Sequence, residues 1–224
     1  MMSWSPLVLS LETAVCATVL TFFLGIGLAY WVLRLPHGQS MADALITLPL
    51  VLPPTVVGFF LLLIFGKRSF IGGILAKADF SLVFTWEAAV IASFIVSLPL
   101  MYRTARGAFE QLDGTIVAAA RTLGISEWRI FWHILLPNAK SGIIAGLVLA
   151  FTRALGEFGA TILFAGNIPG KTQTMSTAIY AAVQANDYDL AFTWAIIIGT
   201  FSFVFVTALN LWLRHNRQGA SSWN

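Results

Sequence analysis

The sequence predicts an all-α integral membrane protein with five transmembrane helices and a helix–turn–helix segment between the third and the fourth. Apolar residues make up 58% of the 224 residues and charged residues only 10%, against about 25% charged residues in a typical soluble domain. Five apolar stretches are long enough to cross roughly 30 Å of hydrocarbon as helices. Backbone polar groups in lipid must be satisfied internally, which favours helices over open strands. Residues 1–224 are therefore expected to form a single transmembrane domain.

Short connections separate the five predicted spans. The spans are expected at residues 9–33, 42–65, 86–102, 141–164 and 190–213. The connections 66–85 and 165–189 contain glycines and scattered charges, and each is predicted to hold a short helix on the outer side. The N-terminus lacks a basic region and a small-residue cleavage site, so the first apolar segment is expected to remain as a helix.

The distribution of lysine and arginine predicts the orientation of these spans. With segment 103–140 in the cytoplasm, eight basic residues outside the spans lie inside and four lie outside. The inside set is Arg34, Arg103, Arg106, Arg121, Arg129, Lys140, Arg214 and Arg217, and the outside set is Lys67, Arg68, Lys77 and Lys171. The N-terminus is then expected outside and the C-terminus in the cytoplasm.

Motifs for catalysis or metal binding are missing from the chain. It contains no G-x-x-x-x-G-K-S/T phosphate loop, so ATP hydrolysis would have to come from another subunit. His37, His133 and His215 are isolated, without the spacing of metal ligands. Cys16 stands alone in an apolar stretch and is interpreted as a packing residue. We expect a chain with no catalytic residues, no metal site and no affinity for nucleic acid.

The second predicted span contains Leu-Pro-Leu-Val-Leu-Pro-Pro at residues 48–54. Proline removes a backbone donor and clashes with the preceding turn, so this helix is expected to kink or break. Broken helices in membranes persist where protein or water satisfies the freed backbone groups, often along a transport path. A transport path and a kink that only shapes packing both remain open interpretations.

The fourth predicted span carries an arginine and a glutamate four residues apart, Arg153 and Glu157. A charged residue at the bilayer centre costs about 2.5–3.5 kcal/mol on insertion scales, which predicts an internal partner. The i,i+4 spacing places the two side chains on one helix face, and Gly156 and Gly159 narrow the helix there. The pair either lines a path or subunit seam as part of a gate, or fixes helix register as a buried ion pair.

The segment between the third and fourth spans is predicted to form two short helices. Asp113 is placed to cap a helix over residues 115–123, and Gly124 to end it in the left-handed conformation. Ser126 and Glu127 would begin a second helix that ends at Pro137. Such an amphipathic pair is either an anchor at the membrane surface or a docking surface, since the alanines at 118–120 let another backbone approach closely.

The same segment resembles the loop that permeases of bacterial ABC importers insert into their ATPase. The loop pattern is Glu-Ala-Ala, three residues, Gly, nine residues, Ile-x-Leu-Pro, and it favours the docking interpretation. The chain has Ala118 where the pattern has its acidic residue, and this departure removes the most polar contact that such a loop offers. The resemblance implies ATPase coupling by Ala118, Ala119, Ala120, Gly124, Ile134, Leu136 and Pro137.

Further segments are similar to the permease family of molybdate (molybdate/tungstate) importers: residues 48–58, the Arg-Ala-Leu-Gly-Glu-Phe-Gly-Ala-Thr stretch at 153–161, and Gly-Asn-Ile-Pro-Gly-Lys-Thr at 166–172. The resemblance implies a type I ABC importer permease fold and a multi-pass location in the bacterial inner membrane. The residues expected at the pathway or gate are Pro53, Pro54, Arg153, Gly156, Glu157, Phe158 and Gly159.

The partners that the resemblance implies are a second copy of the chain, two copies of an ABC ATPase that carry ATP and magnesium, a periplasmic or lipid-anchored oxyanion-binding protein, and membrane lipid. Alternatives are a permease for tungstate or for sulfate/thiosulfate, and a secondary transporter. A secondary transporter often has matching broken helices in two repeats, and no second broken helix is expected here. A membrane-embedded enzyme would need more than the Arg153–Glu157 pair.

Overall fold

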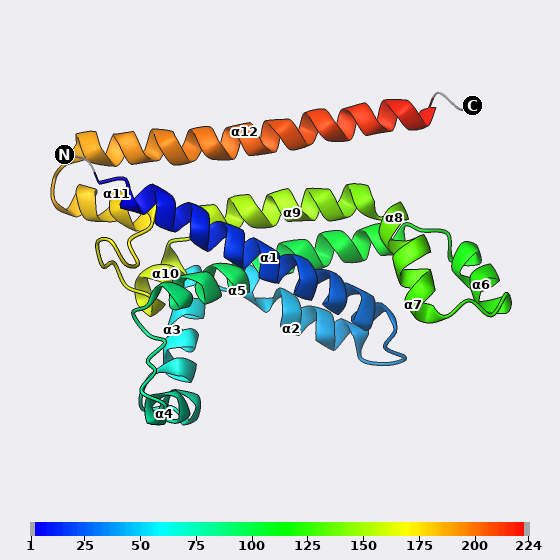
Figure 1. Cartoon of the computed structure of the whole chain (residues 1–224), viewed down its shortest axis with the longest axis horizontal. Coiled ribbons are helices and arrows are strands. Elements are labelled where there is room, and N and C mark those ends of the chain that lie inside the picture. Colours follow the sequence, from blue (N-terminus) through cyan, green and yellow to red (C-terminus); the bar gives the residue numbers. More distant parts are fainter. Residues whose placement is uncertain (1–2, 222–224) are drawn as a thin grey trace.

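The computed structural model describes the backbone of residues 3–221 and the side chains of residues 3–208, 211 and 212, and the described part is helical without strands. Three long helices, α1, α5 and α9, pack together as the centre of the bundle, and α12 lies along one side of it (Figure 1). The helices are α1 Ser5–Leu33, α2 Gln39–Val51, α3 Pro54–Phe65, α4 Phe70–Lys77, α5 Trp86–Glu110, α6 Gly114–Thr122, α7 Glu127–Ile130, η1 Phe131–Leu135, α8 Leu136–Asn138, α9 Lys140–Leu155, α10 Gly159–Phe164, α11 Met175–Gln184 and α12 Tyr188–Ser221.

Small residues allow α1 and α5 to approach closely. The buried face of α1 includes Ala14, Ala17, Gly25 and Ala29. A β-carbon at Gly25 would lie only 2.8 Å from Met101 Cγ, so α5 packs directly against the α1 backbone there. The outward face of α1 exposes large apolar side chains. This arrangement is typical of membrane helices, whose interfaces rely on small residues and close packing.

Membrane-spanning length is reached by three single helices, α1, α5 and α12, in the described chain. The number rises to five when each of two bent pairs counts as one span: α2 with α3, and the α7–α8 stretch with α9. The start of α1 and the end of α12 lie at opposite ends of the bundle, as an odd number of spans requires (Figure 1). The side chains of Arg214, His215 and Arg217 lie outside the described residues.

The second predicted span is broken, as its prolines indicate. Helix α2 ends at Val51, α3 begins at Pro54, and the two helices are bent by 110°. Pro54 stands in the first turn of α3, where its missing N–H leaves no hydrogen bond unmade. Helices α3 and α4 consequently project away from the rest of the bundle (Figure 1), and α4 is the short helix predicted in the 66–85 connection.

The prediction of one continuous helix over residues 141–164 is wrong. Helix α9 ends at Leu155 and α10 begins at Gly159, and the three residues between them are not helical. The physical reason is local, because the Glu157 carboxylate accepts a hydrogen bond from the Ala160 backbone N–H at 2.8 Å. A side chain that bonds nearby backbone groups offers the chain an alternative to the helix. The expectation of no second broken helix is therefore also wrong.

Two other boundaries differ from the prediction. Helix α5 continues to Glu110, beyond the expected end of the third span at residue 102. Pro137 does not end the second helix of the polar segment, because η1 and α8 carry the helical run through it to Asn138. In η1 the Leu136 N–H bonds to the Phe131 carbonyl, five residues back, which makes a π-turn. Pro137, the next residue, has no N–H to donate.

Candidate functional site

The polar segment after α5 forms the predicted helix–turn–helix, which we call the α6–α7 hairpin (residues 113–130). Asp113 caps α6, and its Oδ1 accepts a hydrogen bond from the Thr115 backbone N–H at 2.9 Å. That backbone hydrogen bond holds the pKa of the exposed Asp113 carboxyl below its ordinary value. Gly124 follows α6 with a φ of 73°, in the left-handed region that favours glycine. Both sequence predictions about the ends of this helix are confirmed.

The residues expected to couple to an ATPase divide into an exposed group and a packed group. Ala118, Ala119 and Gly124 are exposed on the hairpin, whereas Ala120 is buried. Ile134 and Leu136 are partly buried in η1 and α8, and Pro137 is exposed. Large apolar side chains are exposed beside the alanines, namely Ile116, Leu123 and Trp128. The exposed surface of the hairpin thus combines small residues with large apolar side chains.

Glu127 connects the hairpin to the end of α1 through an ion pair and a hydrogen bond. Its Oε1 accepts a hydrogen bond from Arg121 Nε at 2.7 Å, and its carboxylate also pairs with Arg34. The Arg34 guanidinium stacks 4.1 Å above the Tyr30 ring, and the Tyr30 hydroxyl donates to the Glu127 carbonyl at 3.2 Å. The Tyr30 ring in turn lies 4.5 Å from the Phe131 ring. The hairpin therefore has a defined position relative to the bundle.

The break between α2 and α3 lies against the break between α9 and α10. A β-carbon at Gly159, the first residue of α10, would be 2.9 Å from Pro54 Cβ, and one at Gly58 would be 2.7 Å from Ala160 Cα. Helices α3 and α10 are accordingly in close backbone contact.

The residues expected at the pathway or gate are only partly brought together. Pro54 and Gly159 meet at this contact, whereas Pro53 and Gly156 are exposed. The Phe158 ring packs 5.2 Å from the Tyr180 ring of α11.

Arg153 and Glu157 form the predicted ion pair even though the helix ends between them. Arg153 Nη1 lies 2.6 Å from Glu157 Oε2. The Glu157 side chain is 1% exposed and the Arg153 side chain 28% exposed, so the pair reaches from the protein interior to its surface. The other carboxylate oxygen caps α10 through the Ala160 N–H. One buried carboxylate thus holds the end of α9, the start of α10 and the arginine together.

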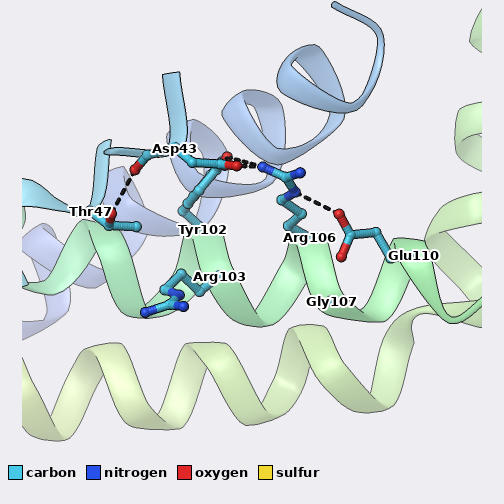
Figure 2. Close-up of a pocket in the computed structure, with 7 residues that line it drawn as sticks. All are labelled: Asp43, Thr47, Tyr102, Arg103, Arg106, Gly107 and Glu110. Carbon is cyan, nitrogen blue, oxygen red and sulfur yellow. Dashed lines mark hydrogen bonds and ion pairs between the residues drawn. The ribbon is translucent and has the colours of Figure 1, made fainter. Parts of the chain in front are cut away.

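A second polar cluster, absent from the predicted site residues, joins α2 to α5 (Figure 2). The Tyr102 hydroxyl and Arg106 both donate to Asp43 Oδ1, and Arg106 Nε also pairs with Glu110 Oε1 at 2.7 Å. These residues line a cavity of about 310 Å³. The i,i+4 spacing of Arg106 and Glu110 is visible in the sequence. Asp43 lies 63 residues away from Arg106, so no local pattern indicates its part in the cluster.

Apolar spanning helices, two of them broken where they touch, and a helical hairpin at one end form the arrangement expected of the membrane component of a transporter. The chain belongs to the family described as binding-protein-dependent transport system inner membrane component, whose model matches residues 18–221. The permease of such an importer works with a separate ATPase and with a substrate-binding protein, and it is not itself an enzyme.

Relatives in bacteria match nearly the whole chain. The chain is 45% identical over 203 residues to YvgM of Bacillus subtilis (strain 168), covering 90% of this chain and 89% of the relative. It is 45% identical over 183 residues to the molybdenum transport system permease protein ModB of Escherichia coli (strain K12), covering 81% and 80%. The sulfate transport system permease protein CysT of Escherichia coli (strain K12) is 36% identical over 204 residues, covering 90% and 73%.

Solved structures support the fold. A bacterial alginate ABC importer covers 96% of this chain and 80% of its own, with a TM-score of 0.74 at 17% identity. The inward-facing methionine ABC transporter MetNI covers 94% of both chains, with a TM-score of 0.73 at 14% identity. The predicted type I importer permease fold is therefore confirmed.

Proposed function

We propose that this chain is the permease subunit of an ATP-driven importer that carries molybdate across the bacterial cytoplasmic membrane. The observation that carries the proposal is the 45% identity to ModB of Escherichia coli, a molybdenum transport permease, over most of both chains. The sulfate permease CysT is less similar, at 36%. Sulfate or thiosulfate and tungstate are the alternative cargoes, because all of these are tetrahedral dianions.

The coupling mechanism follows from the α6–α7 hairpin. We place it in the cytoplasm, with the N-terminus outside and the C-terminus inside, as the distribution of basic residues predicts. ATP and magnesium are bound by the partner ATPase, and closure of two ATPase subunits draws two hairpins together. Because Glu127 and Tyr30 connect the hairpin to α1, its displacement is passed to the bundle. The membrane unit is a homodimer, so that two hairpins meet the two ATPase subunits.

The translocation path runs past the breaks of the second and fourth spans. Helix breaks in membranes are tolerated where they line a path or are covered by protein, and here α3 and α10 cover each other. Arg153 is neutralised by Glu157 at 2.6 Å, so it does not serve as a free cation for the cargo. The pair instead maintains the conformation of the break, and Arg153 reaches the surface that a second copy or the cargo would contact.

Uptake of labelled molybdate tests the proposal directly. Cells without their own high-affinity system would receive the chain with its ATPase and binding protein, and matched cells would lack only this chain. We expect saturable uptake that needs the chain and is blocked by excess tungstate but not by sulfate. Uptake of sulfate without molybdate uptake would rule out molybdate as the cargo but not the assignment as an importer permease. Molybdate uptake independent of the ATPase would refute the coupled mechanism.

A further inference from the structure

A second cavity lies between α5 and α9, at the end of α5 that leads into the hairpin. Its volume is about 480 Å³, larger than the cavity around Asp43. Residues from the last turns of α5, from the connection after it and from the first turn of α9 line it, and Arg103 is its one charged lining residue. A tetrahedral dianion without its hydration shell is much smaller than this volume, so the cavity is large enough to hold one.

Arg103 differs from its neighbour Arg106 in having no carboxylate partner. Arg106 is paired with both Asp43 and Glu110. Arg103, one turn earlier on α5, makes no ion pair with any residue that the structure describes. Figure 2 shows its side chain apart from the dashed contacts of the Asp43 cluster. Arg103 borders both cavities, but the carboxylates of the first are already engaged by Arg106.

Two residues with neutral donor groups, Ser141 and Gln111, line the same cavity as Arg103. Neither side chain makes a hydrogen bond with the described side chains or backbone, and the exposed Gln111 lies at the rim of the cavity. Ser141 also lies in the first turn of α9, where backbone N–H groups and the helix dipole favour negative charge. An arginine fork with added neutral donors is the arrangement that binds tetrahedral oxyanions in proteins.

We propose that the α5–α9 cavity is an oxyanion-binding site, with Arg103 as its charged group and Ser141 and Gln111 as its neutral donors. The proposal rests on the proposed function for its place in transport: with the hairpin in the cytoplasm, the site lies at the inner end of the path and receives the cargo before release. A single exposed arginine binds a hydrated dianion weakly, and an exit site requires such weakness because conduction fails where the ion cannot leave.

The phosphate of an anionic lipid has the same chemistry as a free oxyanion, so the experiment separates the two sources. The full-length chain would be placed in nanodiscs of phosphatidylcholine, and binding of radiolabelled molybdate and of labelled sulfate would be measured by equilibrium dialysis. We expect millimolar binding that weakens about ten-fold in Arg103→Gln, consistent with loss of one charge-assisted contact. Arg103→Lys should recover part of the loss, because it keeps the charge and loses the fork.

The matched control is Arg68→Gln, which removes the same charge from an exposed position outside both cavities. In a second arm, nanodiscs containing phosphatidylglycerol would be analysed by native mass spectrometry for retained lipid. Loss of retained phosphatidylglycerol in Arg103→Gln but not in Arg68→Gln, without molybdate binding, would assign the site to lipid phosphate. If Arg103→Gln bound the free oxyanions and retained phosphatidylglycerol as well as the wild type does, the proposal would be overturned.

These outcomes are separate from those of the uptake experiment. If the wild type transports sulfate instead of molybdate and Arg103→Gln loses sulfate binding, molybdate is refuted as the cargo but the oxyanion site is supported. A chain that transports molybdate with unchanged binding in Arg103→Gln would keep the cargo and refute the site. In the full importer, loss of the site is expected to slow uptake several-fold while the ATPase remains associated.

Discussion

At the scale of single residues, Glu157 has two structural roles that can be separated by substitution. One oxygen pairs with Arg153 and the other accepts the Ala160 N–H. Glutamine at this position keeps an acceptor for the N–H but removes the charge, whereas alanine removes both. Losing one partner of a fully buried pair costs about 3–5 kcal/mol, and the cost is smaller here because Arg153 reaches the surface.

We therefore predict that Glu157→Gln lowers the stability of the chain by roughly 1–3 kcal/mol, and that Glu157→Ala lowers it further. Thermal unfolding in detergent would measure both variants. Arg153→Met in the Glu157→Gln background serves as the control, because removing both charges should recover part of the loss. Equal stability of wild type and Glu157→Gln would show that the pair contributes nothing to the fold.

Asp113 supplies a prediction about pH, because its carboxylate caps α6. The backbone hydrogen bond from Thr115 lowers the pKa of Asp113 in the folded chain. A lowered folded-state pKa stabilises the fold above the unfolded-state pKa, and this contribution disappears as the pH falls through the lowered value. The helix that carries Ala118 and Ala119 should therefore be held at neutral pH and released in acid.

The expected result is that amide hydrogen exchange in α6, corrected for intrinsic rates, becomes faster as the pH falls below about 4. In Asp113→Ala, α6 should exchange a few-fold faster at neutral pH than in wild type, without that pH dependence. Asp113→Asn is the matched control, since asparagine caps helices well and does not titrate. Acid-induced exchange that persists in Asp113→Asn would assign the effect to another group.

At the scale of the elements, the contact between α3 and α10 depends on glycine. A β-carbon at Gly58 would meet Ala160 Cα at 2.7 Å and Ala160 O at 2.8 Å. Both atoms belong to the backbone, so no rotamer change relieves the overlap, and one helix has to move. Alanine in a helix gains about 1 kcal/mol over glycine, but overpacking of a tight contact costs about 1–3 kcal/mol.

We accordingly predict that Gly58→Ala destabilises the chain by up to about 2 kcal/mol, the overpacking cost less the helix gain, and slows uptake. Gly27→Ala is the control, because a β-carbon added at Gly27 in α1 would meet no atom within 4 Å. That variant should be as stable as wild type or slightly more so. Thermal unfolding and uptake would be measured for both, and a neutral Gly58→Ala would mean that the two breaks move freely past each other.

The elements also show what sequence patterns predict in membrane helices. The consecutive prolines Pro53 and Pro54 predicted the break in the second span, because each removes a backbone donor and clashes with the preceding turn. Single prolines are weaker markers, since Pro49, Pro99 and Pro137 lie within helices. The break after α9 has no such marker: Gly156 is tolerated in a helix, and the capping role of Glu157 becomes evident only once Ala160 is in place. The Asp43–Arg106 contact joins α2 to α5 across 63 residues, and sequence spacing carries no information at that distance.

At the scale of the whole molecule, the two ends of the bundle differ in structure. One end carries the α6–α7 hairpin, and α10 and α11 lie toward the other (Figure 1). The core around Ile26, Tyr102 and Ile143 joins α1, α5 and α9, and a separate core cluster joins α5 to α3 and α10. In the proposed mechanism, a displacement of the hairpin therefore reaches the breaks through α5, which belongs to both clusters. This continuity is the physical requirement for an ATPase to act on a path that it does not touch.

The proposed docking of the ATPase on the hairpin can be tested at Ala119. Ala119 is exposed in α6, so a larger side chain there disturbs docking of a partner but not the core of the chain. We expect Ala119→Trp to reduce co-purification of the ATPase and to lower molybdate uptake by about ten-fold or more, because overpacking an interface by 1–3 kcal/mol corresponds to factors of this size. Thermal unfolding of the isolated chain should not change. Ala76→Trp makes the same substitution at an exposed alanine of α4 and should retain the ATPase. If Ala119→Trp kept both ATPase association and uptake, the small residues of α6 would have no part in coupling, and the hairpin would be an anchor at the membrane surface.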